Sequence, residues 1–205
     1  MAIKKLVEVW DGENLIPDNI NFLKKETKEV RLPFPDEINQ ILADLFDTYK
    51  TIPCAGIAAN QLGFDKKVFI GMKHEKDEQN SDDSSRNIDE VKPDPDNYEI
   101  YINPKIDKIN KKSTQTGEEG CLSIPFLTLE LERYDQIKVR YYDMDGHKIK
   151  KPLSGFLSRL YQHELDHLNG NLMLEHDNIL NASMWSKDEK YKNLTIKLLK
   201  YLSSK

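Results

Sequence analysis

The chain has 205 residues, of which 32% are charged and 38% hydrophobic, and its formal net charge is −5. This length can bury the core of one domain without a disulfide scaffold, and the acidic balance argues against general nucleic-acid binding and specific DNA binding, although it leaves room for a local basic patch. Because no run of about 18 apolar residues could cross a bilayer and the first ten residues lack an export signal, we expect a single soluble, cytoplasmic domain over residues 1–205, with no membrane contact.

The first predicted element is an amphipathic helix over residues 35–49. Its apolar residues recur at three- and four-residue steps, and the start P-D-E is typical of a helix N-terminus. Short segments rich in β-branched or aromatic residues follow and predict strands. These strands cover residues 67–72, 98–103, 127–131, 136–143 and 147–150.

A hairpin turn is predicted at residues 143–146, where the sequence D-M-D-G separates the last two strands. A second helix follows over residues 153–169, and Gly170 stands where a left-handed residue often ends a helix. Strands in the middle of the chain with helices at both ends predict an α+β fold rather than an alternating parallel sheet.

Two segments carry strong local charge. Residues 74–97 contain nine acidic and three basic residues, a balance of −6, and predict a long polar loop insertion. Residues 187–205 contain six lysines against two acids, and an apolar stripe there predicts a lysine-rich helix over about 186–203. We expect this helix to dock on the domain, with contact to an acidic partner such as RNA as the alternative.

The most specific motif is Q-H-E-L-D-H over residues 162–167, within the second predicted helix. His163 and His167 are four residues apart, so both imidazoles project from one helical face and can share a metal ion. Glu164 lies between them, where its carboxylate can accept and deliver a proton. The motif therefore predicts metal-assisted hydrolysis, with a pair of surface histidines as the alternative.

The third ligand separates the enzyme classes that use this motif. A metzincin protease would place a histidine where Met173 stands, and a thermolysin-like protease would need a downstream glutamate, for which Glu175 is too near. Upstream, E-G-C-L-S over residues 119–123 offers the thiolate of Cys121. Two histidines and one cysteine leave a fourth position open, which is the pattern of a catalytic metal site.

A run of small residues, C-A-G-I-A-A-N-Q over residues 54–61, precedes both of these motifs. Small side chains allow close approach of a backbone or a substrate, although such a run is more often a packing seam. The three segments, in this order, resemble the peptide deformylase family, whose pattern is G-x-G-x-A-A-x-Q, E-G-C-L-S and Q-H-E-x-D-H. The resemblance covers most of the chain between the first helix and Asp177.

The resemblance implies an α+β fold in which antiparallel sheets pack around the central helix that carries the H-E-x-x-H motif, followed by a C-terminal helix. It also implies an enzyme, a hydrolase of protein biosynthesis that removes the formyl group from the N-terminal formyl-methionine of nascent polypeptides and releases formate. Contact of the C-terminal helix with the ribosome is a further expectation from the family.

Carried over residue by residue, the resemblance implies that Cys121, His163 and His167 bind one divalent metal. The family typically uses Fe²⁺, and Zn²⁺, Ni²⁺ or Co²⁺ can occupy the same site. Glu164 would be the general acid and base. The amide of Gln61 and the backbone N–H of Leu122 would stabilise the oxyanion formed at the formyl group.

Further residues are candidates for substrate contact and support. The resemblance implies substrate contacts from Gly56, Ile57 and Gly120, and a methionine side chain calls for apolar residues such as Phe156 and Leu160. Three charged residues are expected to support the metal ligands. These are Glu119, as a partner of one histidine ring, and Arg133 with Asp166, as an ion pair, although Arg133 could equally be an exposed strand charge.

Two residues depart from the expected pattern. Cys54 replaces a glycine of the first motif and adds a side chain where the family leaves room for the backbone. Arg159 lies one turn before His163, and we expect its guanidinium to reach solvent along an apolar stem, with an altered pocket as the alternative. Another H-E-x-x-H metallopeptidase or amidase, or a catalytically weakened deformylase-like binding protein, are the rival interpretations.

Overall fold

The computed structural model describes residues 4–75 and 96–204. Most of the acidic loop expected over residues 74–97 thus lies outside the described residues. The helices described are α1 (Pro17–Leu23), α2 (Glu37–Thr51), α3 (Gly155–Leu168) and α4 (Glu189–Ser203), with 3₁₀ turns η1 (Ala59–Leu62) and η3 (Met173–Glu175). The strands described are β1 (Gly56–Ala58), β2 (Val68–Met72), β3 (Tyr98–Ile109), β4 (Thr114–Cys121), β5 (Ile124–Tyr134), β6 (Ile137–Tyr142), β7 (Lys148–Leu153) and β8 (Ile179–Met184).

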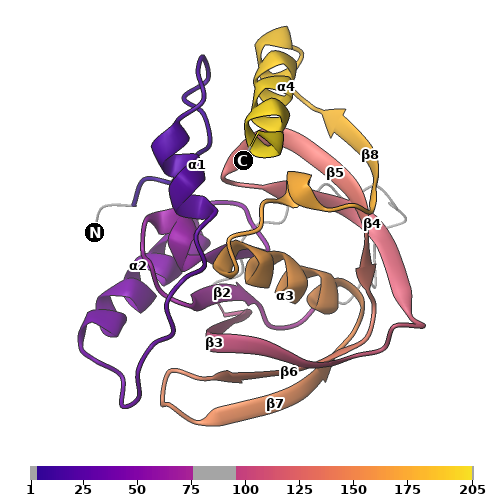
Figure 1. The fold of residues 1–205 in the computed structure, drawn as a ribbon. Coiled ribbons are helices and arrows are strands. Elements are labelled where there is room, and N and C mark those ends of the chain that lie inside the picture. The colour runs from indigo at the N-terminus through magenta and orange to yellow at the C-terminus, as the bar shows by residue number, and fades with distance from the viewer. Residues whose placement is uncertain (1–3, 76–95, 205) are drawn as a thin grey trace.

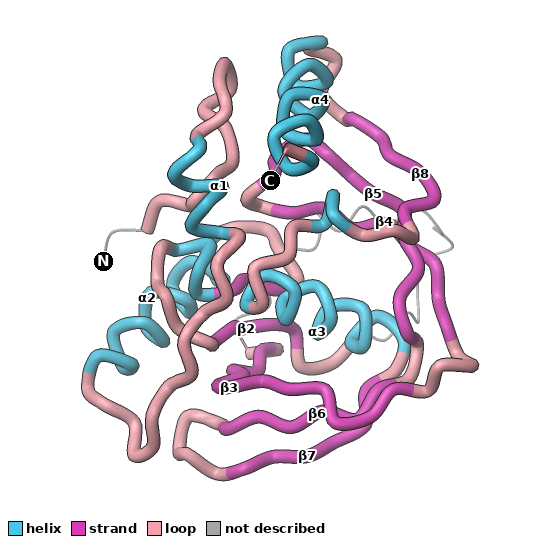
Figure 2. Tube along the Cα trace, in the orientation of Figure 1, coloured by secondary structure: helices cyan, strands magenta, loops and turns pink. Residues whose placement is uncertain are grey.

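Two antiparallel sheets enclose helix α3 (Figure 1). One sheet has the strand order β1-β2-β3-β6-β7, and the other has the order β4-β5-β8. Figure 2 shows α3 between β2 and β3 on one side and β4 and β5 on the other. This arrangement confirms the predicted α+β fold, with antiparallel sheets around a central helix and a helix at the C-terminus.

Strand β2 is buried on both faces, because helices cover both sides of its sheet. Val68 and Ile70 belong to the core that α2 closes, together with Ile38 and Leu45. Phe69, between them, points to the other face, as alternate residues of a strand do. On that face it belongs to a second core with residues of α3.

An aromatic cluster fixes α3 on the five-stranded sheet. The ring of Phe69 stacks on Tyr101 with centroids 4.3 Å apart, and Tyr161 of α3 meets both rings edge-on at 5.3 and 5.4 Å. Edge-to-face and offset pairs are the favoured geometries of aromatic rings and contribute beyond buried area. The helix therefore has a defined rotation, which directs the opposite face toward β4 and β5.

Several elements escaped prediction, and each is short or polar. Strand β4 reads T-Q-T-G-E-E-G-C, which lacks the β-branched pattern of a strand, and it lies at an edge of its sheet. Helix α1 has seven residues, β1 has three, and β8 is a largely exposed edge strand. Strands β3 and β5 extend beyond the predicted bounds because the polar ends of their hairpins continue the ladder.

Helix α4 begins three residues later than predicted, where the side chain of Asp188 accepts a hydrogen bond of 3.0 Å from the backbone of Lys190. Leu194 and Leu198 are buried in a core cluster with Trp10. The helix thus docks on the domain, as expected, and its lysines face outward. Across the described residues, every helix is too short or too polar to span a membrane.

Gly170 follows the C-terminal end of α3 and adopts the left-handed backbone conformation, with φ +77°. A Cβ at this position would lie 2.4 Å from the backbone oxygen of Lys24, so a side chain would clash as well as strain the backbone. Gly146, in the hairpin between β6 and β7, has φ +78° but only Phe34 at 3.9 Å from the same position. A side chain at either glycine would therefore strain the backbone, but only a side chain at Gly170 would also clash with a neighbouring atom.

We predict that Gly170→Ala lowers the free energy of unfolding by at least about 2 kcal/mol, because strain and backbone collision add. Gly146→Ala is the matched control and should cost about 1 kcal/mol from strain alone. Urea unfolding of the two variants, at one fixed metal concentration, measures the difference. Equal losses of free energy of unfolding in the two variants would show that the backbone at Lys24 moves aside without lowering stability.

Candidate metal centre and active site

Helix α3 and strand β4 bring the three predicted ligands together. His163 and His167 lie one turn apart on the helix, with ring centroids separated by 5.1 Å. Cys121 ends β4, and its Sγ is 3.2 Å from Nε2 of His167. The three ligand atoms all lie within 4.8 Å of one another. Such a compact set of one sulfur and two nitrogens has the composition of a catalytic metal site.

The electrostatics of the three ligands favour a positive charge among them. Burial opposes ionisation of Cys121, but the charges and hydrogen bonds of His167 and His163 outweigh it and lower the pKa of the thiol to about 5. Burial also opposes a charged His163, yet Cys121 and Glu119 raise the pKa of this imidazole well above its usual value. A thiolate and a neighbouring carboxylate thus attract a cation, and the donor set fits a divalent metal.

Glu119 of β4 orients the ring of His163. Its Oε2 lies 2.9 Å from Nδ1 of His163, which leaves Nε2 to face the space shared with Cys121. Glu119 also receives two hydrogen bonds of 2.9 Å from the guanidinium of Arg133. Burial alone would raise the pKa of Glu119, but its bonds to His163 and Arg133 hold the pKa well below the usual value. The carboxylate is therefore charged, as a partner of a metal-bound imidazole should be.

Arg133 of β5 joins Glu119 to Asp166 on α3. Its Nη1 donates to Oδ2 of Asp166 at 2.5 Å, so the ion pair considered from the sequence is present. Arg133 is 7% exposed, which excludes the alternative of an exposed strand charge. Asp166 also contacts Nε2 of His176 at 2.8 Å.

The guanidinium of Arg159 does not reach solvent, so the expectation for this residue was wrong. Arg159 is 5% exposed, and its Nη1 donates to Oε1 of Glu119 at 2.9 Å. It also donates to the backbone oxygens of Gly117, Leu131 and Gln115 at 3.1 to 3.2 Å. The physical reason is the charge of Glu119 together with the missing side chain at Gly117, where a Cβ would lie 3.1 Å from the guanidinium.

Glu164 is buried beside the three predicted metal ligands and lies next to Gly56 of the small-residue motif over residues 54–61. A Cβ on Gly56 would lie 2.7 Å from its Oε1, so only glycine leaves room for this carboxylate. Burial raises the pKa of Glu164 to about 7, although His163 and His167 act in the opposite direction. Its Oε2 finds no hydrogen-bond partner within the described part of the chain. A buried carboxylate with one unpaired oxygen is suited to proton transfer.

Gln61 is held with its amide nitrogen toward the ligands. Its Oε1 accepts from the backbone N–H of Ala58 at 2.9 Å. Its Nε2 lies 3.8 Å from Sγ of Cys121 and 3.3 Å from Oγ of Ser123. Leu122 follows Cys121 in the turn between β4 and β5. The side-chain amide of Gln61 therefore lies beside Cys121, and the backbone amide of Leu122 is the next one along the chain.

The pocket at this site is narrow. Its free volume is about 40 Å³, which is room for roughly three water molecules. Besides ligand residues and Glu164, its lining includes Gly56, Gly120, Phe156, Leu160, Cys54 and the buried Arg159. The side chain of Ile57, in contrast, is fully buried in the core closed by α2, so only its backbone is available to a substrate.

Cys54 lines the pocket as a neutral thiol. It is 5% exposed and belongs to the same core as Ile57. Burial and the negative charge of Glu164 both raise the pKa of its thiol above the usual range. The extra side chain in the first motif therefore adds apolar bulk to the pocket wall without adding charge.

Sequence reasoning missed three contributors. Ser123 is fully buried and holds the amide of Gln61, and His176 contacts Asp166. The side chain of Asn60 donates to the backbone oxygen of His167 at 2.6 Å. In the sequence, Ser123 and Asn60 are marked only by belonging to the motifs over residues 119–123 and 54–61. His176 lies nine residues after His167, and no sequence pattern around it indicates a contact with the site.

Comparisons with known proteins agree with this geometry. The family model of polypeptide deformylase matches residues 13–182. The peptide deformylase of Brucella suis is 33% identical over 195 residues, which cover 95% of this chain and 94% of the relative. Peptide deformylase 1 of Corynebacterium efficiens is 37% identical over 142 residues, or 69% of this chain and 73% of the relative.

Solved structures show the same likeness. The peptide deformylase of Ehrlichia chaffeensis in complex with actinonin is 26% identical, with a TM-score of 0.67 and coverage of 98% of both chains. The peptide deformylase of Thermotoga maritima is 27% identical, with a TM-score of 0.64, and the match covers 88% of this chain and all of that one. The match of sequence, fold and ligand set leads to one conclusion: the chain belongs to the polypeptide deformylase family.

Proposed function

We propose that Cys121, His163 and His167 hold the metal with which this deformylase removes the formyl group from nascent polypeptides. The observation that carries the assignment is the convergence of their three ligand atoms within 4.8 Å beside the buried carboxylate of Glu164. The family implies a divalent metal, and iron(II) is the proposed ion in the cell. A thiolate and two imidazoles suit zinc, nickel and cobalt as well, so availability decides the occupant.

Glu164 is proposed as the general acid and base. A bound divalent cation polarises a carbonyl oxygen and lowers the pKa of a bound water. Glu164, with a pKa near 7 and one unpaired oxygen, takes up a proton at Oε2 and delivers it to the amine that leaves the formyl group. Gly56 keeps the carboxylate in place because it leaves no side chain between the strand and Oε1.

Gln61 and Leu122 are proposed to stabilise the charge that develops on the formyl oxygen. The amide nitrogen of Gln61 points toward Cys121, and its orientation is set by Ala58 and Ser123 before any substrate binds. Donors fixed in advance stabilise a developing oxyanion without reorganisation. Phe156 and Leu160 line the same pocket and supply its apolar wall for the methionine side chain.

The setting of the reaction also follows as a proposal. We place the protein in the cytoplasm as one catalytic domain, acting on formylated chains as they leave the ribosome. The outward lysines of α4 support a contact of this helix with the ribosome, because its apolar face is already used for docking.

We predict that Cys121→Ala releases the metal, because a soft thiolate is one of only three protein ligands. Metal content per folded chain, measured after gel filtration, should fall at least tenfold at equal free metal concentration. Cys54→Ala is the matched control, since that thiol is neutral and is not a ligand, and it should retain the metal. Retention by the Cys121 variant would favour a different class of H-E-x-x-H hydrolase.

We predict that Glu119→Gln weakens metal binding by about 10- to 100-fold, because a neutral amide orients and polarises His163 less effectively. Glu118→Gln, at the exposed neighbouring position of β4, is the control and should bind as the wild type does. Competition with a chelator, followed by metal analysis of the folded fraction, measures the affinity. Equal metal affinities of the two variants would show that Glu119 does not support metal binding.

We predict that Glu164→Gln retains the metal but lowers the rate of deformylation by about 10³-fold, which is typical for loss of a general acid and base. Formate release from formyl-Met-Ala-Ser, with protein loaded anaerobically with iron, measures the rate. No turnover by the metal-loaded wild type would support the rival interpretation of a deformylase-like binding protein.

A further inference from the structure

The outer face of the five-stranded sheet carries a group of cations outside the catalytic pocket. In β6, Lys138 and Arg140 alternate with the buried Ile137, Val139 and Tyr141, so both point away from the core. Residues opposite each other on neighbouring strands share a face, which adds cations from β3 and β7. This basic face consists of Lys105, Lys108, Lys138, Arg140, Lys148 and Lys150.

The register of these strands places like charges directly opposite one another. Arg140 is opposite Lys105 on one side and Lys150 on the other. Lys138 is opposite Lys108 in the next row. Directly opposed like charges destabilise a sheet, and neighbours about 5–7 Å apart lie within one Debye length of each other. The face therefore bears a concentrated positive potential that a polyanion would neutralise.

Few acidic side chains balance this face. Glu29 lies 2.5 Å from Nζ of Lys105, and Asp107 lies 3.1 Å from Arg140. Lys108, Lys138, Lys148 and Lys150 have no ion-pair partner among residues 4–75 and 96–204. Because the whole chain has a net charge of −5, this surplus is a local arrangement and not a consequence of a basic composition.

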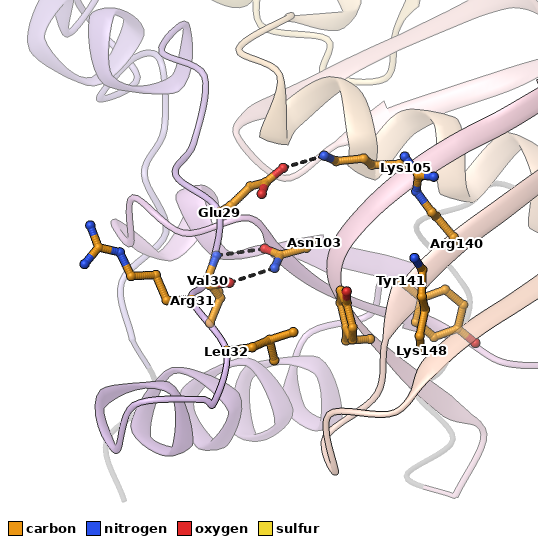
Figure 3. Close-up of a pocket in the computed structure, with 10 residues that line it drawn as sticks. Glu29, Val30, Arg31, Leu32, Asn103, Lys105, Arg140, Tyr141 and Lys148 are labelled. Atoms are coloured by element: carbon orange, nitrogen blue, oxygen red, sulfur yellow. Dashed lines mark hydrogen bonds and ion pairs between the residues drawn. The ribbon is translucent and has the colours of Figure 1, made fainter.

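The basic face borders a pocket with a volume of about 600 Å³ (Figure 3). Its lining includes Lys105, Arg140 and Lys148, together with the apolar surfaces of Leu32 and Tyr142. Leu32 is 47% exposed, and Tyr142 is partly exposed. Arg31 also lines the pocket, and Figure 3 shows its side chain directed away from the sheet that carries the other cations.

We propose that the basic face binds the phosphodiester backbone of a single-stranded nucleic acid, with a base entering the adjoining pocket. The cations span three strands, which is wider than one small anion requires and suits a chain of phosphates. An aromatic side chain beside a basic surface is the arrangement that stacks an unpaired base. The interaction lies outside the catalytic pocket and does not depend on the metal ligands.

The test is fluorescence anisotropy with labelled oligouridine and oligothymidine of about 12 nucleotides, between about 50 and 200 mM salt. The test variant is Lys108→Gln/Lys138→Gln/Lys150→Gln. The matched control is Lys5→Gln/Lys25→Gln/Lys50→Gln, which removes three exposed lysines that lie outside both the basic face and α4. Both proteins keep every residue of the active site.

The test variant should bind at least about tenfold more weakly at the lowest salt, and its slope of log affinity against log salt should be smaller by about 2. The control should bind within about twofold of the wild type. Formate release by the test variant should equal that of the wild type, and its thermal midpoint should be unchanged or higher, because like-charge pairs are removed.

Binding of both oligonucleotides would support recognition of the shared backbone, and stronger binding of oligouridine would add the ribose as a contact. The proposal would be overturned by no binding of the wild type at the lowest salt, or by an equal or greater loss in the control. Competition by polyglutamate as effective as that by oligouridine would also overturn it, because the face would then select any acidic polymer.

Discussion

The buried carboxylate of Glu119 connects three elements at the point where the metal ligands meet. It contacts His163 and Arg159 of α3, and it accepts hydrogen bonds from Nε and Nη2 of Arg133 of β5, all at 2.9 Å. A charge removed from water is tolerated only when it is fully paired. The pairing in turn determines the distance between β4 and α3, and this distance brings Cys121 within reach of His167.

Glycines make this close approach of elements possible. Gly117 leaves space for the guanidinium of Arg159, and Gly56 leaves space for the carboxylate of Glu164. A Cβ would lie 3.1 Å from the guanidinium of Arg159 in the first place and 2.7 Å from Oε1 of Glu164 in the second, and the site uses both charged groups. The geometry of the site therefore depends on absent side chains as much as on those present, and the aromatic contacts of Tyr161 with the opposite sheet keep α3 in register.

Charge is arranged locally in this chain, and its net value hides the arrangement. Around the ligands, a thiolate and carboxylates favour a cation, whereas the outer face of the five-stranded sheet concentrates positive charge. An overall charge of −5 describes neither region. The effect of a charged group falls off within about a Debye length, so each surface presents its own potential to a ligand.

The sequence by itself determined the α+β class, the long helices and the identity of the residues that converge at the site. The class and the helices follow from local periodicity, and a helix alone places His163 and His167 on one face because of their i, i+4 spacing. The other site residues were identified through the resemblance of three motifs to the peptide deformylase family. Only the tertiary structure decided the edge strand β4, the burial of Arg159 and the partnership of His176 with Asp166. These depend on pairing between residues far apart in the chain, and no local pattern encodes which charges will share a carboxylate once water is excluded.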